Sequence, residues 1–178
     1  MGNNQTSSFD PLVNGHLCGL FEISSSIKHN DAALQQRASA ALEQNVSDWI
    51  SVINGAMPGV GTMIGDSIRA SVQHEISIAF AMLHCRCSDS TRCQCENAEL
   101  MRDSVSAMQT TQESIVSGLN KIVGKESMWR SLLTNQLIGI IDYFHALSKN
   151  SNELQEMQRR CFLQGNELSA ALTSCILG

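Results

Sequence analysis

The sequence predicts an all-α protein that folds as an antiparallel bundle of about five helices. Apolar residues recur every three or four positions through most of the chain, which is the spacing of a helix with one buried face. Only two prolines, Pro11 and Pro58, occur in the 178 residues, so long stretches lack the strongest helix breaker. No segment alternates apolar and polar residues at period two, and we therefore expect no β-sheet.

The first strongly periodic segment runs from Asp31 to Met57. Its apolar positions follow helical spacing: Leu34, Ala38, Leu42, Val46, Trp49, Ile50 and Ile53. Asn30 or Asp31 is placed to cap the N-terminus of this helix. Several glycines around Pro58 then end the helix and predict a tight corner.

Three further helices follow at 62–84, 96–123 and 125–148. The segment 62–84 carries an apolar stripe of Ile64, Ile68, Val72, Ile76, Phe80 and Leu83. Gly124 is a stop signal for the helix before it. A polar break at 149–152 precedes a last helix, whose apolar positions approach a coiled-coil seam: Leu154, Met157, Cys161, Leu168, Leu172 and Cys175.

We expect one domain at 31–178, because a chain of this length suits a single core. Residues 1–30 differ in composition, since they are rich in Asn, Ser and Gly. They predict a flexible N-terminal arm. A short apolar island at 17–23 within this arm is expected to form a docking turn or helix.

Charged residues make up 16% of the chain, against about 25% in a typical soluble domain. Depletion of charge is typical of the cores of protein interfaces, so we expect a homo-oligomer or contacts with other protein subunits. The net charge is −5 and the cations are scattered. This pattern argues against nucleic acid as a partner, since such proteins carry a clustered basic surface.

The segments that target a chain to or across membranes are not visible. No stretch approaches the roughly 20 apolar residues of a membrane span, and residues 1–30 lack the charged start and apolar run of a secretory signal. We expect a cytoplasmic protein at the membrane periphery, with a secreted or virion protein as the alternative.

Residues 1–6, Met-Gly-Asn-Asn-Gln-Thr, fit the N-myristoylation pattern, with glycine after methionine and threonine at the sixth position. The pattern predicts a myristoyl group on Gly2 and peripheral association with membranes. One such chain binds membranes only marginally, and no basic cluster follows it. We expect Cys18 to be a buried structural cysteine, and a second acylation at this residue is the alternative.

Cys85, Cys87, Cys93 and Cys95 form two C-x-C pairs separated by five residues. Four thiolates can enclose Zn²⁺ or bind Cu(I), with His84 as an alternative ligand. Structural zinc sites usually use C-x₂₋₄-C spacing, so we predict no cofactor, with zinc as the alternative. In an oxidising compartment the four residues would form two disulfides, and in the cytosol they would be free or acylated. Cys161 and Cys175 are expected in the core.

Catalytic motifs are not recognisable. His74 and Glu75 do not extend to the zinc motif H-E-x-x-H, since position 78 is isoleucine. The glycine-rich segment 59–65 follows no strand, so we interpret it as a corner between helices and not as a phosphate loop. A membrane-active element at 50–68 is its alternative.

We therefore expect a non-enzymatic structural or interaction protein, self-assembling and held at a membrane by Gly2, as in a viral matrix, virion or adaptor-like component. Two alternatives remain open. One is a metal-binding or thiol-redox module centred on Cys85 to Cys95. The other is a secreted filament or membrane-inserting subunit with a disulfide-stapled loop.

Overall fold

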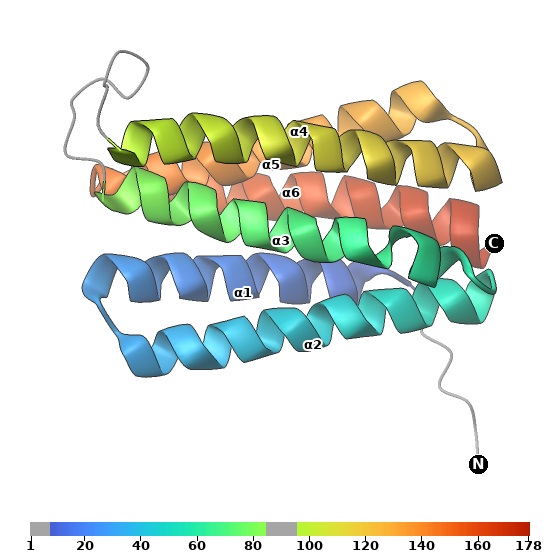
Figure 1. Cartoon of the computed structure of the whole chain (residues 1–178), viewed down its shortest axis with the longest axis horizontal. Helices are drawn as coiled ribbons and strands as arrows, with labels where there is room; N and C mark the ends of the chain where they lie inside the picture. The colour runs from blue at the N-terminus through green and yellow to red at the C-terminus, as the bar shows by residue number, and fades with distance from the viewer. Residues whose placement is uncertain (1–7, 85–95) are drawn as a thin grey trace.

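The computed structural model describes residues 8–84 and 96–178, which form six α-helices arranged side by side (Figure 1). The helices are α1 (Asp10–His29), α2 (Ala32–Ala56), α3 (Val60–His84), α4 (Glu96–Val123), α5 (Glu126–Ser148) and α6 (Leu154–Leu172), and a π-helical turn, η1 (Thr173–Leu177), follows α6. The described ranges contain no β-strand. The all-α class is confirmed, with one helix more than expected.

Successive helices reverse direction, so the bundle has two distinct ends (Figure 1). The amino end holds Phe9, the turns at 57–59 and 124–125, and residues 173–178. The distal end holds the turns at 30–31 and 149–153, together with His84 and Asn97. At the amino end the backbone N–H of Phe9 donates to Thr173 Oγ1 at 3.0 Å, which joins the two termini of the bundle.

Helix α1 corrects the prediction of a flexible arm at 1–30. Pro11 lies in its first turn, where the missing N–H costs no hydrogen bond. Leu17 and Leu20 have no exposed surface, and α1 packs against α2, α3 and α6. The segment that resembled an arm in composition is therefore part of the core from Phe9 onward, whereas residues 1–7 lie outside the described residues.

Two predicted helix boundaries are confirmed by their geometry. The side chain of Asp31 accepts a hydrogen bond from Leu34 N at 2.9 Å and caps α2. Gly124 adopts a φ of +70° just after α4, a left-handed conformation that glycine takes without steric cost. Both residues act locally, which is why the sequence alone located them.

The predicted corner between α2 and α3 is also confirmed. A Cβ atom on Gly61 would collide with the backbone oxygen of Ile50, and one on Gly65 would lie 2.8 Å from Ile50 Cδ1. The two glycines thus let α3 begin in direct contact with α2. Their spacing serves close helix packing.

The buried face of α3 differs from the predicted stripe at its C-terminal half. Phe80 is 43% exposed and stacks on the ring of His84, whereas Ile78 and Ala79 are buried. The reason is that α3 packs against α1, α2, α4 and α5, so its buried surface is wider than one stripe. Glu75 is included in that surface and is only 4% exposed.

Candidate functional site

The two sites predicted at Gly2 and at the four loop cysteines, Cys85, Cys87, Cys93 and Cys95, lie outside the described residues. The residues that flank them are described, and they lie at opposite ends of the bundle. Phe9 is at the amino end, whereas Asn97 Nδ2 donates to His84 O at 3.1 Å at the distal end. A helix as long as α3 separates these ends, about 35 Å at 1.5 Å per residue. The described residues next to the two candidates are therefore far apart.

His84, the alternative metal ligand, is engaged by its own helix. Its Nδ1 lies 3.0 Å from Phe80 O, and its ring stacks on Phe80 with centroids 4.3 Å apart. Across residues 8–84 and 96–178, no group of three or more His, Cys, Asp or Glu side chains is arranged to hold a metal ion. A zinc site thus stays a prediction about residues 85–95.

The other cysteines differ in environment. Cys18 is exposed, so its interpretation as a buried structural cysteine is wrong. Partial desolvation and the neighbouring Glu22 carboxylate raise the pKa of Cys18, which lowers its thiolate fraction. Cys161 is a core residue as predicted, and burial raises its pKa to about 12. Cys175 is only half-buried, with its Sγ 3.6 Å from Lys125 Nζ.

The amino end has an unusual surface. Residues 49–65 and 168–178 contain no charged side chain. Met63 is 51% exposed, and Met57 and Val60 keep partial exposure. Helix α4 ends beside them, where Lys121 and Lys125 are exposed. The result is an apolar surface with two lysines beside it, and the carboxylates of Asp10 and Glu126 are exposed at the same end. No helix in the described ranges is both long and apolar enough to span a bilayer.

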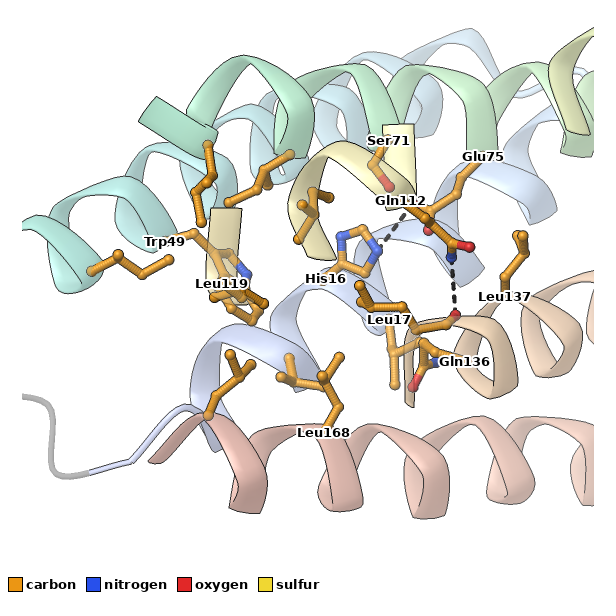
Figure 2. A pocket seen from close by; sticks show the side chains of 17 residues that line it. His16, Leu17, Trp49, Ser71, Glu75, Gln112, Leu119, Gln136, Leu137 and Leu168 are labelled. Carbon is orange, nitrogen blue, oxygen red and sulfur yellow. Dashed lines mark hydrogen bonds and ion pairs between the residues drawn. The ribbon is translucent and has the colours of Figure 1, made fainter. Parts of the chain in front are cut away.

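A cavity of about 110 Å³ lies inside the bundle, and all six helices contribute side chains to its wall (Figure 2). Toward the amino end the wall is apolar, with Trp49, Ile53, Ile64, Leu119, Leu168 and Leu172. Near the middle of the bundle it becomes polar, with His16, Ser71, Glu75, Gln112 and Gln136. Figure 2 shows the labelled apolar residues Trp49, Leu119 and Leu168 apart from Ser71, Glu75 and Gln112. The cavity is therefore amphipathic along the bundle axis.

His16 and Glu75 form an ion pair across the polar end. His16 Nε2 lies 3.0 Å from Glu75 Oε2, and the two side chains are 20% and 5% exposed. This contact supplies the buried carboxylate with a cation when His16 is protonated.

Burial and the Glu75 carboxylate act in opposite directions on the pKa of His16. Burial lowers the pKa of His16, but the charge of the Glu75 carboxylate and its contact with the ring outweigh burial, so that the pKa of His16 lies above its usual value. The imidazolium form is thus favoured in the folded protein. Among the residues that line the cavity, His16 and Glu75 are the titratable pair.

The remaining polar residues are satisfied unequally. Gln112 Nε2 donates to Leu133 O at 2.9 Å, and Ser71 Oγ donates to Met108 Sδ at 3.3 Å. Gln136 is 8% exposed, and neither Oε1 nor Nε2 has a hydrogen-bond partner within the chain. An unpaired buried polar group costs about 1–3 kcal/mol, so such an amide is typical of a place that a ligand or water completes.

The sequence analysis missed this site. His16 was assigned to the arm, and Glu75 was considered only as part of a zinc motif. A usable signal was present: Glu75 and Gln136 each lie at helical spacing from apolar residues, Glu75 from Ile68 and Val72, and Gln136 from Leu133. A polar residue on an apolar stripe indicates a buried polar group that needs a partner.

Comparison with known proteins identifies no relative, since no protein-family model, no curated protein and no solved structure matches the chain. The functional proposals that follow therefore depend on the residues and the geometry described above.

Proposed function

We propose that this protein is a non-enzymatic helical interaction protein that self-assembles and associates peripherally with membranes through a myristoyl group on Gly2, as a matrix, virion or adaptor-like component does. The observation that carries the proposal is the myristoylation pattern at residues 1–6. The amino end supports it, because Met63 is exposed within the uncharged segment 49–65 and Lys121 and Lys125 are exposed at the same end.

The length of the chain connects the lipid to this surface. Gly2 precedes Phe9 by seven positions, which span at most about 25 Å when fully extended. Phe9 has no exposed surface and packs on Trp49 with ring centroids 5.3 Å apart. A membrane-inserted acyl chain would therefore hold the amino end close to the lipid headgroups.

The surface of the amino end supplies the second membrane-binding signal that a single acyl chain lacks. One myristoyl group gives only marginal, reversible membrane binding, and stable association takes a second signal. A lysine close to an anionic membrane contributes about 1 kcal/mol, and Lys121 and Lys125 are both exposed at the amino end. Exposed Met63 adds apolar area beside them. We expect binding that prefers anionic membranes and weakens with salt.

Vesicle flotation of protein co-expressed with an N-myristoyltransferase tests this proposal. Intact mass first measures acylation, and flotation then compares Gly2→Ala, Met63→Glu and Phe80→Glu on vesicles with and without anionic lipid. Phe80 is the matched control, because it is also an exposed apolar residue of α3 but lies at the distal end. We expect Gly2→Ala to abolish flotation and Met63→Glu to reduce it several-fold, with Phe80→Glu unchanged.

Two results would contradict the proposal. An unmodified Gly2 in the presence of the transferase would remove the anchor. Equal loss of flotation in Met63→Glu and Phe80→Glu would show that the amino end is not the surface that faces the membrane.

Self-assembly is supported by exposed apolar residues on α5 and α6. Ile138 is 45% and Leu163 is 50% exposed. They flank the contact in which Gly139 lies against Gln164, so both occupy the seam between two adjacent helices. Light scattering should report an oligomer that Ile138→Glu together with Leu163→Glu dissociates. A wild-type protein that stays monomeric at all accessible concentrations, with or without the lipid, would exclude this part of the proposal.

A further inference from the structure

We propose that the central cavity is a binding site for a small, neutral amphipathic molecule with an apolar body about the size of one aromatic ring and one hydroxyl group. The inference is independent of membrane association. It rests on the volume of the cavity, on the separation of its apolar and polar walls, and on buried hydrogen-bonding atoms that the chain leaves without partners.

The volume limits the ligand. The cavity holds about 110 Å³, somewhat less than an engineered apolar cavity of about 150 Å³ that binds benzene. A single substituted ring or a short branched chain therefore fits with modest adjustment of the walls. The protein's own myristoyl group does not fit, because its methylenes need roughly 350 Å³ if each occupies about the volume of one water molecule.

The unpartnered atoms specify the polar group. Gln136 presents one free donor, Nε2, and one free acceptor, Oε1. A hydroxyl group donates one hydrogen bond and accepts others, so it can complete atoms of both kinds. A ligand carboxylate would meet the charge of Glu75 at close range, and a wholly apolar ligand would leave the amide of Gln136 unsatisfied.

The orientation follows from the two walls. The apolar body would lie among Trp49, Leu119 and Leu168, toward the amino end, and the hydroxyl would face Glu75 and Gln136 (Figure 2). His16, Ser71 and Gln112 at the polar end keep partial exposure, and so does Trp49 at the apolar end. Gln136 is more than nine-tenths buried, which makes its free amide a feature of the cavity and not of the surface.

Phenol is the probe that matches this description, and benzene is its apolar counterpart. Each is titrated into the full chain while the ¹H–¹⁵N spectrum and the midpoint of thermal unfolding are recorded. We expect phenol to shift the resonances of residues around His16, Gln112 and Gln136 in a saturable manner and to raise the unfolding temperature. Benzene should bind several-fold more weakly, because it leaves the polar atoms unpaired.

Variants distinguish the cavity from other places where phenol binds. Gln136→Leu removes both free amide atoms and should weaken the binding of phenol about five- to tenfold, the equivalent of one hydrogen bond. The affinities for phenol and benzene should then differ less than in the wild type. Leu168→Phe fills the apolar end and should abolish binding of both. Gln155→Leu, an exposed change on α6, is the control and should leave both affinities unchanged.

Several results would overturn the proposal. The first is the absence of saturable shifts with phenol, which would mean that the cavity holds water only. The second is equal affinity of the wild type for benzene and phenol. The third is undiminished binding of phenol by Leu168→Phe. Urea unfolding of each variant confirms that it is folded at the temperature of the titration. If Leu168→Phe does not fold, Gln136→Leu decides alone.

Discussion

His16 and Glu75 show how a buried charged pair depends on both of its members. Glu75 is 4% exposed as a residue, and a carboxylate at such a position is costly unless a cation or hydrogen bonds compensate for lost hydration. His16 provides the cation only while it is protonated. The contact therefore links the charge state of α1 to that of α3, and its contribution to stability depends on pH.

The pH dependence has a definite sign. Because the pKa of His16 is raised in the folded protein, its contribution to the free energy of unfolding is fully present below the unfolded-state pKa of about 6.5 and is lost as the pH rises through the folded pKa. In Glu75→Gln the carboxylate is gone and only burial acts on His16. Its pKa should then fall below the unfolded value, so that the contribution grows with rising pH.

Urea unfolding between pH 5.5 and 8.5, an interval that includes the ordinary histidine pKa of about 6.5, measures how the free energies of unfolding of the wild type and of Glu75→Gln differ. We expect the stability of the wild type relative to Glu75→Gln to decrease steadily across this interval. A difference that is constant with pH would show that His16 does not change its proton affinity on folding.

Helix α1 is the element that the sequence analysis misjudged, and its burial can be tested directly. Leu20 has no exposed surface, so Leu20→Ala should lower the free energy of unfolding by about 2–5 kcal/mol. Glu22→Ala, an exposed change two positions along the same helix, should alter it by less than about 0.5 kcal/mol. Chemical denaturation of both proteins supplies the comparison, and equal, small effects would favour the flexible arm.

The corner between α2 and α3 offers a matched pair of glycines. Gly61→Ala introduces a Cβ that collides with the backbone oxygen of Ile50, and overpacking of this kind costs about 1–3 kcal/mol. A Cβ on Gly55 meets nothing within 4 Å, so Gly55→Ala in α2 should stabilise the protein by about 0.5–1 kcal/mol. Calorimetric or urea unfolding should give effects of opposite sign, and effects of the same sign would contradict the close approach.

These elements also show what the sequence could and could not predict. Asp31 and Gly124 act on backbone within a few residues, so local rules located the ends of α2 and α4. The all-α class followed from periodicity, which needs no knowledge of neighbours. The segment 10–29 was missed because its serines, its glycines and Asn14 are poor helix formers, and burial between other helices overrides that preference. The cavity required residues from six separate helices, and no spacing along the chain encodes their meeting.

At the scale of the molecule, the bundle separates three candidate activities along its axis. The amino end holds Phe9, seven positions after Gly2 in the sequence, and presents Met63 with Lys121 and Lys125. The middle encloses the amphipathic cavity. The distal end carries His84 and Asn97, which flank the four loop cysteines. A change at one end should therefore leave the chemistry of the other intact.

Removal of metal should reflect this separation. The metal-binding groups that the sequence offers are the four cysteines at 85–95, which follow His84 of the distal end in the sequence. A strong chelator is therefore expected to leave the flotation of the acylated protein unchanged, as measured on the same vesicles with and without chelator. Loss of flotation on chelation would connect the loop to the membrane surface and contradict the separation.

The central claim is that the acylated protein meets the membrane with its amino end. Hydrogen–deuterium exchange of the myristoylated protein, free and bound to anionic vesicles, tests this most directly. Peptides that cover 57–63 and 121–128 should gain protection on binding, and peptides that cover 29–34 and 148–154 should exchange at unchanged rates. Protection at 29–34 and 148–154, or no change at 57–63 and 121–128, would contradict the account.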